Sequence, residues 1–218
     1  KSVPDGYTLL VSGRALWLMT MMADNAPFDV MRDFAPIAQT TRGPEVFVVH
    51  PDMPVRTTGD LIALAKSKPG ELRYGSGGDG VNNHLASELF KSMAGVDIRR
   101  VRFENSSKRM AALIAGEIDM HFTGLCSAAP HIKAGKAKPL GLTTLHRSAL
   151  APEIPTIAES GLPGYENITI GALFAPAGTP AAIVQRLSGA VTRYLKSDAA
   201  KEQFSHDGYE PVGGSPEE

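Results

Sequence analysis

The sequence lacks several features that would assign it to a class of protein at once. It has a single cysteine, Cys126, among 218 residues, so no internal disulfide can form. No apolar run approaches the roughly 18 residues of a membrane-spanning helix. The net charge is -1 and the basic residues are scattered, which excludes the electrostatic footprint of a nucleic-acid-binding protein. We therefore expect a small-molecule partner and no nucleic acid.

The chain also lacks a recognisable catalytic or metal-binding constellation. Its six histidines are dispersed and form no ligand pair, so we predict that they are surface or helix-cap residues. Cys126 has no catalytic signature around it and is predicted to be a small buried hydrophobe. No nucleophile and base pair is found. We expect no enzyme activity, no metal and no cofactor.

What the chain does have is an alternation of strand and helix patterns. Short apolar runs predict strands, and 3.6-residue periodicity with Gly or Pro stops predicts helices between them. Ser106 or Ser107 is predicted to cap the helix at 108–115. The predicted strands cover residues 7–12, 46–50, 71–74, 98–103, 118–122, 139–144 and 170–175, and the predicted helices cover 58–66, 83–93, 108–115, 128–134 and 180–196. This order indicates an α/β fold with parallel strand pairs.

Two apolar extended segments, 46–51 and 167–173, divide the alternation into two halves. Each segment would carry the chain from one half to the other. We predict two lobes that meet at a hinge, with residues 1–47 and 170–218 in the first lobe and 48–169 in the second. Ligands of open α/β sheets bind at the carboxyl ends of the strands, so the two sets of strand ends are predicted to face one cleft.

The glycine-rich run at residues 75–80, GSGGDG, is the most informative motif. It lies between a predicted strand and a predicted helix, where exposed backbone N–H groups and the helix dipole favour an anion. The run also satisfies the G-x-G-x-x-G pattern, and Glu104 lies near the place of a ribose-binding acid. A nucleotide is therefore an alternative guest to a carboxylate.

Ordered motifs along the whole chain resemble one family, the periplasmic solute-binding receptors of tripartite tricarboxylate transporters, also called the Bordetella uptake gene family. The matching segments are residues 4–10 (PDGYTLL), 32–37 (RDFAPI), 48–51 (VVHP), 84–95 (HLASELFKSMAG), 116–120 (GEIDM), 130–136 (PHIKAGK), 159–166 (ESGLPGYE) and 175–180 (APAGTP).

The resemblance implies a two-lobed periplasmic binding protein of type II, a Venus flytrap that captures a small carboxylate for integral-membrane transporter subunits. It implies no catalysis, a periplasmic location and a monomer. Members of the family have a further strand and glycine-rich loop at the start and a further helix at the end. The chain is therefore expected to be truncated at both ends, which would also account for the missing export signal.

In the first lobe the resemblance directs attention to the loop after the first strand, which reads Ser12, Gly13, Arg14. Arg14 is placed to clamp a carboxylate in bidentate fashion. The alternative is a solvated arginine that pairs with an acid such as Asp24. Thr169 enters the returning strand where relatives often have an aromatic residue, which predicts a roomier or more polar pocket.

In the second lobe the glycine-rich loop supplies Ser76, Gly77 and Gly80 as candidate ligand-binding residues, through their backbone N–H groups. Asn82 and Asn83 follow, and each would either contact the ligand or only cap the helix. The carboxylate of Asp79 is expected to point outward, because it would repel an anionic ligand.

Two further candidates lie beyond the loop. Ser106 opens the next helix and is a second candidate donor, although capping alone would also explain it. Thr123 follows the strand at 118–122, where relatives often have Asp, and its neutral side chain would make the cleft less negative.

Three functions follow from these observations. The leading one is an extracytoplasmic receptor that binds a small organic carboxylate and delivers it to a tripartite tricarboxylate-type transporter. The alternatives are an NAD(P)-dependent oxidoreductase that uses the loop at 75–80 and Glu104, and a ligand sensor or scaffold on the same fold.

Overall fold

The computed structural model describes residues 2–22 and 26–216 and divides them into two compact units. Unit 1 comprises Lys1–Gly43 and Thr169–Glu218, and unit 2 comprises Pro44–Ile168. The chain passes from unit 1 to unit 2 after Gly43 and returns after Ile168. The predicted lobe boundaries, 47/48 and 169/170, are close to these two points. The hinge itself stays a prediction.

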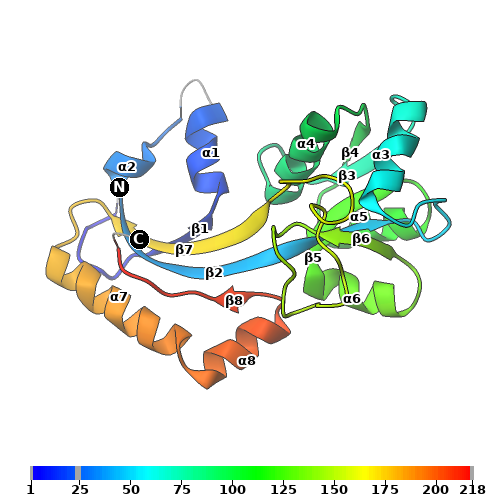
Figure 1. The fold of residues 1–218 in the computed structure, drawn as a ribbon. Helices are drawn as coiled ribbons and strands as arrows, with labels where there is room; N and C mark the ends of the chain where they lie inside the picture. The colour runs from blue at the N-terminus through cyan, green and yellow to red at the C-terminus, as the bar shows by residue number, and fades with distance from the viewer. Residues whose placement is uncertain (1, 23–25, 217–218) are drawn as a thin grey trace. The chain divides into compact units, whose positions relative to one another are not determined.

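Unit 1 is built on a sheet with the strand order β1, β7, β2, β8 (Figure 1). β1 and β7 are antiparallel, and β8 is antiparallel to the first part of β2. The elements of this unit are β1 (Leu10–Gly13), α1 (Ala15–Met22), α2 (Val30–Asp33), the first part of β2 (Phe34–Val49), β7 (Ile168–Pro176), α7 (Ala181–Leu195), α8 (Asp198–His206) and β8 (Glu210–Pro211).

The core of unit 1 follows from the alternation of side chains along β7. Ala172 and Phe174 point to one face, where Leu16 of α1 and Val30 of α2 pack against them. Leu173 and Ala175 point to the other face, which the apolar stripe of α7 covers. Both faces of this part of the sheet are therefore covered by helices.

Unit 2 has a mixed sheet with the strand order β6, β2, β5, β3, β4. β3 is parallel to both β4 and β5, whereas β2 is antiparallel to β5 and β6. Its elements are the second part of β2, α3 (Thr58–Ser67), β3 (Arg73–Ser76), α4 (Asn82–Ala94), β4 (Arg99–Arg102), α5 (Ser106–Ile114), β5 (Met120–Gly124), α6 (Leu125–Lys133) and β6 (Lys138–Leu142).

Helices cover the sheet of unit 2 on both faces. Phe47 and Val49 of β2 point toward α3 and α4, whereas Val46 and Val48 point toward α5 and α6. At the centre of the first layer, Phe47 stacks on Phe122 with the ring centroids 4.4 Å apart. The two central strands, the second part of β2 and β5, are therefore buried on both faces, so a polar residue on them must find its partners in the interior.

The predicted α/β class with parallel pairs is confirmed, but several elements differ from their predicted bounds. β2 begins at Phe34 and not at residue 46, because Gly43 and Pro44 do not break the strand. The helices α1 and α8 were not predicted, although Ser197 caps α8 by accepting from the N–H of Ala200. Within the described residues, no helix combines the length and the apolar character needed to cross a membrane.

Candidate functional site

The candidate site of unit 2 lies at the carboxyl ends of its parallel strands. Because β3, β4 and β5 run in the same direction, the starts of α4, α5 and α6 follow at the same edge of the sheet. None of these three helices has an acidic residue in its first turn. The residues before α4 and α6, Val81 and Gly124, make no side-chain cap hydrogen bond. The positive ends of three helix dipoles therefore lie at this edge without an acidic residue in their own first turns, although the buried Glu45 of β2 pairs with Gly124 at the same edge.

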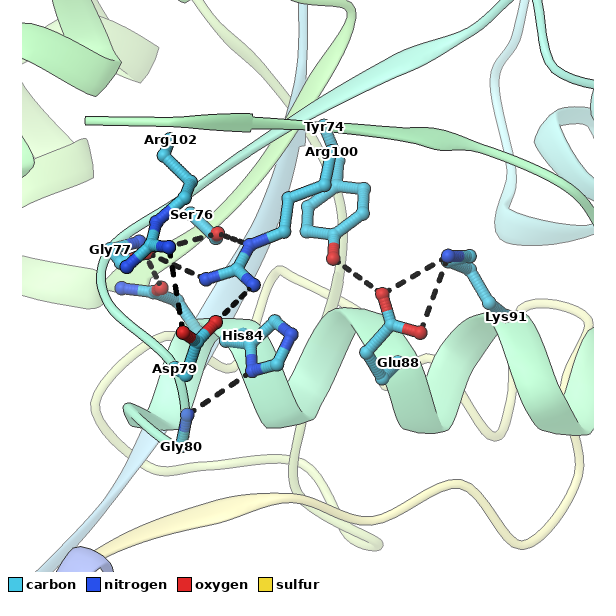
Figure 2. A network of polar contacts seen from close by, with 11 residues as sticks. Tyr74, Ser76, Gly77, Asp79, Gly80, His84, Glu88, Lys91, Arg100 and Arg102 are labelled. Carbon is cyan, nitrogen blue, oxygen red and sulfur yellow. Dashed lines mark hydrogen bonds and ion pairs between the residues drawn. The ribbon is translucent and has the colours of Figure 1, made fainter.

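The glycine-rich loop that joins β3 to α4 is tied to the first turns of the helix. The N–H of Gly77 donates to Asn83 Oδ1 at 3.0 Å. The N–H of Gly80 donates to His84 Nδ1 at 3.2 Å (Figure 2). Gly80 has φ 73°, a left-handed conformation that favours glycine. The N–H groups of Gly77 and Gly80, both predicted to contact a ligand, are thus already used inside the loop.

Arg100 of β4 holds the same loop from the neighbouring strand. Its guanidinium donates to Ser76 Oγ at 2.5 Å, to Asp79 Oδ1 at 2.5 Å and to the carbonyl of Gly77 at 2.8 Å (Figure 2). Arg102 lies 3.5 Å from the other Asp79 oxygen. The hydrogen bond from Arg100, together with Arg102, lowers the pKa of Asp79 below its usual value. Asp79 therefore serves as a counter-charge to two arginines, and its side chain is half-exposed.

A second polar chain supports the α4 side of the loop. The hydroxyl of Tyr74 donates to Glu88 Oε1 at 2.5 Å, and Lys91 donates to the same carboxylate (Figure 2). Burial raises the pKa of Tyr74 above its usual value, and the hydrogen bond to Glu88 adds to this effect. Burial also lowers the pKa of His84, and the nearby Arg100 adds to that effect. His84 is thereby favoured in its neutral form, in which Nδ1 accepts from Gly80.

The two asparagines at the start of α4 do not cap the helix with their side chains. Asn82 is the first residue of α4 and Asn83 is the second, and the residue in the cap position is Val81. Asn83 instead fixes Gly77 of the loop. Capping alone, one of the two predicted roles, is therefore wrong for both residues, and contact with a ligand stays a prediction.

Ser106 and Thr123 come together where α5 begins and β5 ends. Their hydroxyl oxygens are 3.4 Å apart, and Thr123 is buried. The predicted cap of α5 by Ser106 or Ser107 is wrong, because Asn105 accepts from the N–H of Lys108 at 2.9 Å. Asn105 competes best because its side chain precedes the first helical residue. The hydroxyl of Ser106 is consequently not engaged in capping.

Sequence reasoning missed Arg109, a buried residue of α5. A Cβ atom at position 77 would lie 3.4 Å from Arg109 Nη1, and one at position 75 would lie 3.6 Å from its Cδ. The arginine thus passes beneath the glycine-rich loop. Its spacing from the buried Ala112 and Leu113, three and four residues on, was the signal that placed it on the inner face of the helix.

His121 of β5 was predicted to lie at the surface and is fully buried. Burial, assisted by the charge of Arg109, lowers its pKa from 6.5 to about 3, against a small opposing contribution from the backbone of Gly75. Neither ring nitrogen makes a well-formed hydrogen bond with the described residues. The prediction failed because β5 is central in the sheet, so its alternate residues are buried on both faces.

The predicted residues of unit 1 lie along β1 and β7. Ser12 pairs with Ala172 across these strands, and Thr169 is the second residue of β7. Arg14 follows β1 directly, and its carbonyl accepts from the N–H groups of Trp17 and Leu18 at the start of α1. The alternative partner Asp24 lies outside the described residues. The roles of Ser12, Arg14 and Thr169 stay predictions.

Cys126 and Glu104, both discussed from the sequence, lie at exposed positions. Cys126 is exposed and not buried, because it is the second residue of α6 and lies on the outer face of that helix. Glu104, the acid of the nucleotide interpretation, is exposed and pairs with Lys108 at 2.5 Å. No group of three side chains suited to a metal ion occurs in the part of the chain that the structure describes.

Helix starts gathered at the carboxyl ends of parallel strands form the usual ligand site of an open α/β sheet. The family model of the tripartite tricarboxylate transporter family receptor matches residues 1–218, so the chain belongs to this family. The predicted family is thereby confirmed.

Relatives and solved structures agree with this assignment. A protein of Pseudomonas sp. (strain P51), named for the tcbD-tcbE intergenic region, is 35% identical over the whole chain, which spans 65% of that protein's length. Protein BugT of Bordetella pertussis is 30% identical, and the chain spans 68% of it.

Among solved structures, R. palustris Rpa4515 with adipate is 35% identical, with a TM-score of 0.89, and covers 100% of this chain and 73% of its own. MatC from Rhodopseudomonas palustris with bound malate is 26% identical, with a TM-score of 0.80, and covers 95% of this chain and 71% of its own. Both confirm the fold of a periplasmic binding protein.

Proposed function

We propose that this chain is the ligand-binding part of a periplasmic receptor that captures a small organic carboxylate and hands it to a tripartite tricarboxylate-type membrane transporter. Unit 2 would contribute the starts of α4, α5 and α6 and the hydroxyls of Ser106 and Thr123. The family supports the receptor role, and the adipate and malate bound to two similar proteins support the ligand class.

The observation that carries the proposal is the absence of acidic residues from three helix starts at one sheet edge. The one carboxylate in the glycine-rich loop, that of Asp79, is occupied by Arg100 and Arg102. An incoming carboxylate therefore meets helix-terminal N–H groups, hydroxyls and no unpaired negative side chain of the loop.

A thermal-shift screen of the whole chain tests this function. Adipate, malate, succinate, citrate and benzoate are each added at millimolar concentration, with chloride at matched ionic strength as the reference. At least one carboxylate is expected to raise the Tm, since a ligand that binds only the folded state stabilises it by mass action. No shift with any of the five would contradict the proposed ligand class.

Asn83→Asp is the matched site variant. Aspartate keeps the acceptor that holds Gly77 but places a negative charge at the start of α4, so the carboxylate affinity should fall about tenfold or more. Gln185→Glu, the same amide-to-acid change on the exposed first turns of α7 in unit 1, is the control and should leave the affinity unchanged. Equal effects of the two variants would remove unit 2 from the site.

A fluorescence titration with NADH tests the oxidoreductase alternative. No increase in NADH fluorescence is expected.

A further inference from the structure

Arg109 differs from the other buried or half-buried arginines of unit 2 in having no charged partner at contact distance. Arg73 pairs with Asp119 at 3.3 Å and Arg100 pairs with Asp79, although both are more exposed than Arg109. Arg109 is 93% buried, since only 7% of its surface is exposed. No hydrogen bond or ion pair of its guanidinium is found among the described residues, and its Nε is sealed from solvent without a partner.

The nearest compensating charge acts on Arg109 only from a distance. Glu45, a buried residue of β2, favours the charged form of Arg109, but the two groups do not approach within the 4.0 Å of an ion pair. Burial works in the other direction and lowers the pKa of Arg109. Arginine nevertheless stays charged in proteins, so the interior of unit 2 holds a cation that lacks its full counter-charge.

The groups around Arg109 also do not supply a counter-charge. The charge of Arg109 helps to lower the pKa of His121, so the imidazole is neutral and cannot act as a counter-ion. Arg109 and Lys108 are both in the first turns of α5, where the helix dipole is positive and a cation is least favoured. A buried cation in this position destabilises the unliganded protein unless an anion reaches it.

The glycine-rich loop packs directly against the guanidinium. A Cβ atom at position 77 would lie 3.4 Å from Arg109 Nη1, so the absence of a side chain on Gly77 lets the loop backbone approach this charge closely. The hydroxyls of Ser106 and Thr123 lie at the same sheet edge, at the start of α5 and the end of β5. Neutral donors and one full positive charge are thus gathered at this edge, together with the buried carboxylate of Glu45, which pairs with Gly124 at the end of β5.

From this arrangement we infer that Arg109 is a specificity-determining residue of the site, and that its guanidinium supplies the counter-charge for a carboxylate of the ligand. The inference rests on the proposed function and deepens it. A ligand must bring a full negative charge to this point, so its amide or ester is rejected. The buried cation destabilises the unliganded protein, and binding of the carboxylate removes this destabilisation.

The test compares Arg109→Met with Glu45→Gln in the whole chain. The ligand is whichever of adipate, malate, succinate and citrate raises the Tm most, and adipamide, the uncharged diamide of adipate, is the neutral reference. Arg109→Met is expected to weaken carboxylate binding by about 10- to 100-fold, the range for a lost charge-assisted contact. It should leave the Tm of the empty protein unchanged or raise it, because a buried unpaired charge is removed.

Glu45→Gln separates a ligand contact from an internal ion pair. If Arg109 serves the ligand, removing the competing charge of Glu45 strengthens carboxylate binding, so the two variants act in opposite directions. If Arg109 and Glu45 form a structural pair, both variants lower the Tm and weaken binding alike, which overturns the inference. Undiminished carboxylate binding by Arg109→Met, or equal binding of adipamide by the unaltered chain, overturns it as well.

A failure of the proposed function gives a different result. If none of the four carboxylates shifts the unaltered chain, sulfate at matched ionic strength probes the cation directly. A larger shift for the unaltered chain than for Arg109→Met keeps Arg109 as an anion site, whereas equal shifts reject it.

Discussion

Units 1 and 2 bury their surfaces to different degrees. In unit 1, Tyr7, Met31, Met21, Val11 and Val3 are all more than two thirds exposed, with Tyr7 at 93%. The large exposed hydrophobic residues of unit 2, Leu89, Met93 and Leu145, are only 37 to 40% exposed. Unit 1 also has a largely apolar cavity of about 560 Å³ beside β1 and α2.

The two units also place their unusual residues differently. In unit 2 the apolar side chains are well buried, and the unusual residues, the cation Arg109 and the neutral His121, lie in the interior. In unit 1 the unusual residues are large apolar side chains that are exposed to solvent. Buried polar groups without full compensation are typical of functional sites. Exposed apolar side chains that lie together are typical of interaction surfaces.

The largest expected effect comes from the closed core of unit 2. Phe47→Ala removes a ring that stacks on Phe122 and lies 5.1 Å from the ring of Phe90, so we expect a loss of about 3 to 5 kcal/mol in the free energy of unfolding. Val11→Ala in the exposed face of unit 1 should change it by less than about 0.5 kcal/mol. Urea denaturation measures both, and similar losses would erase the contrast between the units.

The second prediction concerns pH. His121 has its folded pKa near 3 and its ordinary value at 6.5, so the unfolded chain takes up a proton below pH 6.5 that the folded chain refuses. Stability due to this residue is complete above pH 6.5 and is lost as the pH falls toward 3, by about 2 to 3 kcal/mol at pH 4.5. Urea midpoints at pH 7 and 4.5 measure the loss. His121→Met should show a smaller loss over that interval, and an equal loss would refute the assignment.

A smaller effect is expected where Arg100 holds the glycine-rich loop. Arg100→Met removes hydrogen bonds to Ser76, Asp79 and the Gly77 carbonyl, which should cost about 1 to 2 kcal/mol. Amide hydrogen exchange at residues 77–80 should become faster. Arg99→Met, at an exposed position of the same strand, is the control and should alter neither quantity. Unchanged exchange in Arg100→Met would show that the loop is held by other contacts.

The smallest effect on stability comes from the exposed face of unit 1. Tyr7→Ser should change the free energy of unfolding by less than about 0.5 kcal/mol, since the side chain packs against little. It should nevertheless reduce the fluorescence of bound anilinonaphthalene sulfonate, which reports exposed apolar surface. Leu89→Ser in unit 2 should reduce that signal less. The reverse order would show that the dye binds to unit 2.

Patterns that depend on local chemistry were predicted well from the sequence. The periodic spacing of Ala86, Phe90 and Ala94, ended by the left-handed Gly95, located α4 to within a residue. The glycine-rich loop was identified from its composition and its place between a strand and a helix. Asp79 was expected to point outward, and its half-exposed carboxylate does so while it pairs with Arg100 and Arg102.

Features that depend on distant contacts could not be predicted in the same way. Cys126 resembled a buried residue because its neighbours are small and apolar, yet its helix faces outward there. Arg109 was not singled out from the sequence, because arginine is usually exposed, whereas α5 packs against β3 and β5 and Arg109 is buried. The hydrogen bonds of Asn83 and Arg100 to the loop needed the geometry of two strands and a helix together, which spacing alone does not provide.

The bare backbone at Gly77 has a consequence for how the site could change in the course of evolution. A single methyl group at this position would stand 3.4 Å from Arg109 Nη1 and 3.1 Å from the side chain of Val81. The cation would then be screened although no charged residue had changed. The strength of the anion preference can thus be tuned by the size of residue 77, a small mutational step that leaves the folding core intact.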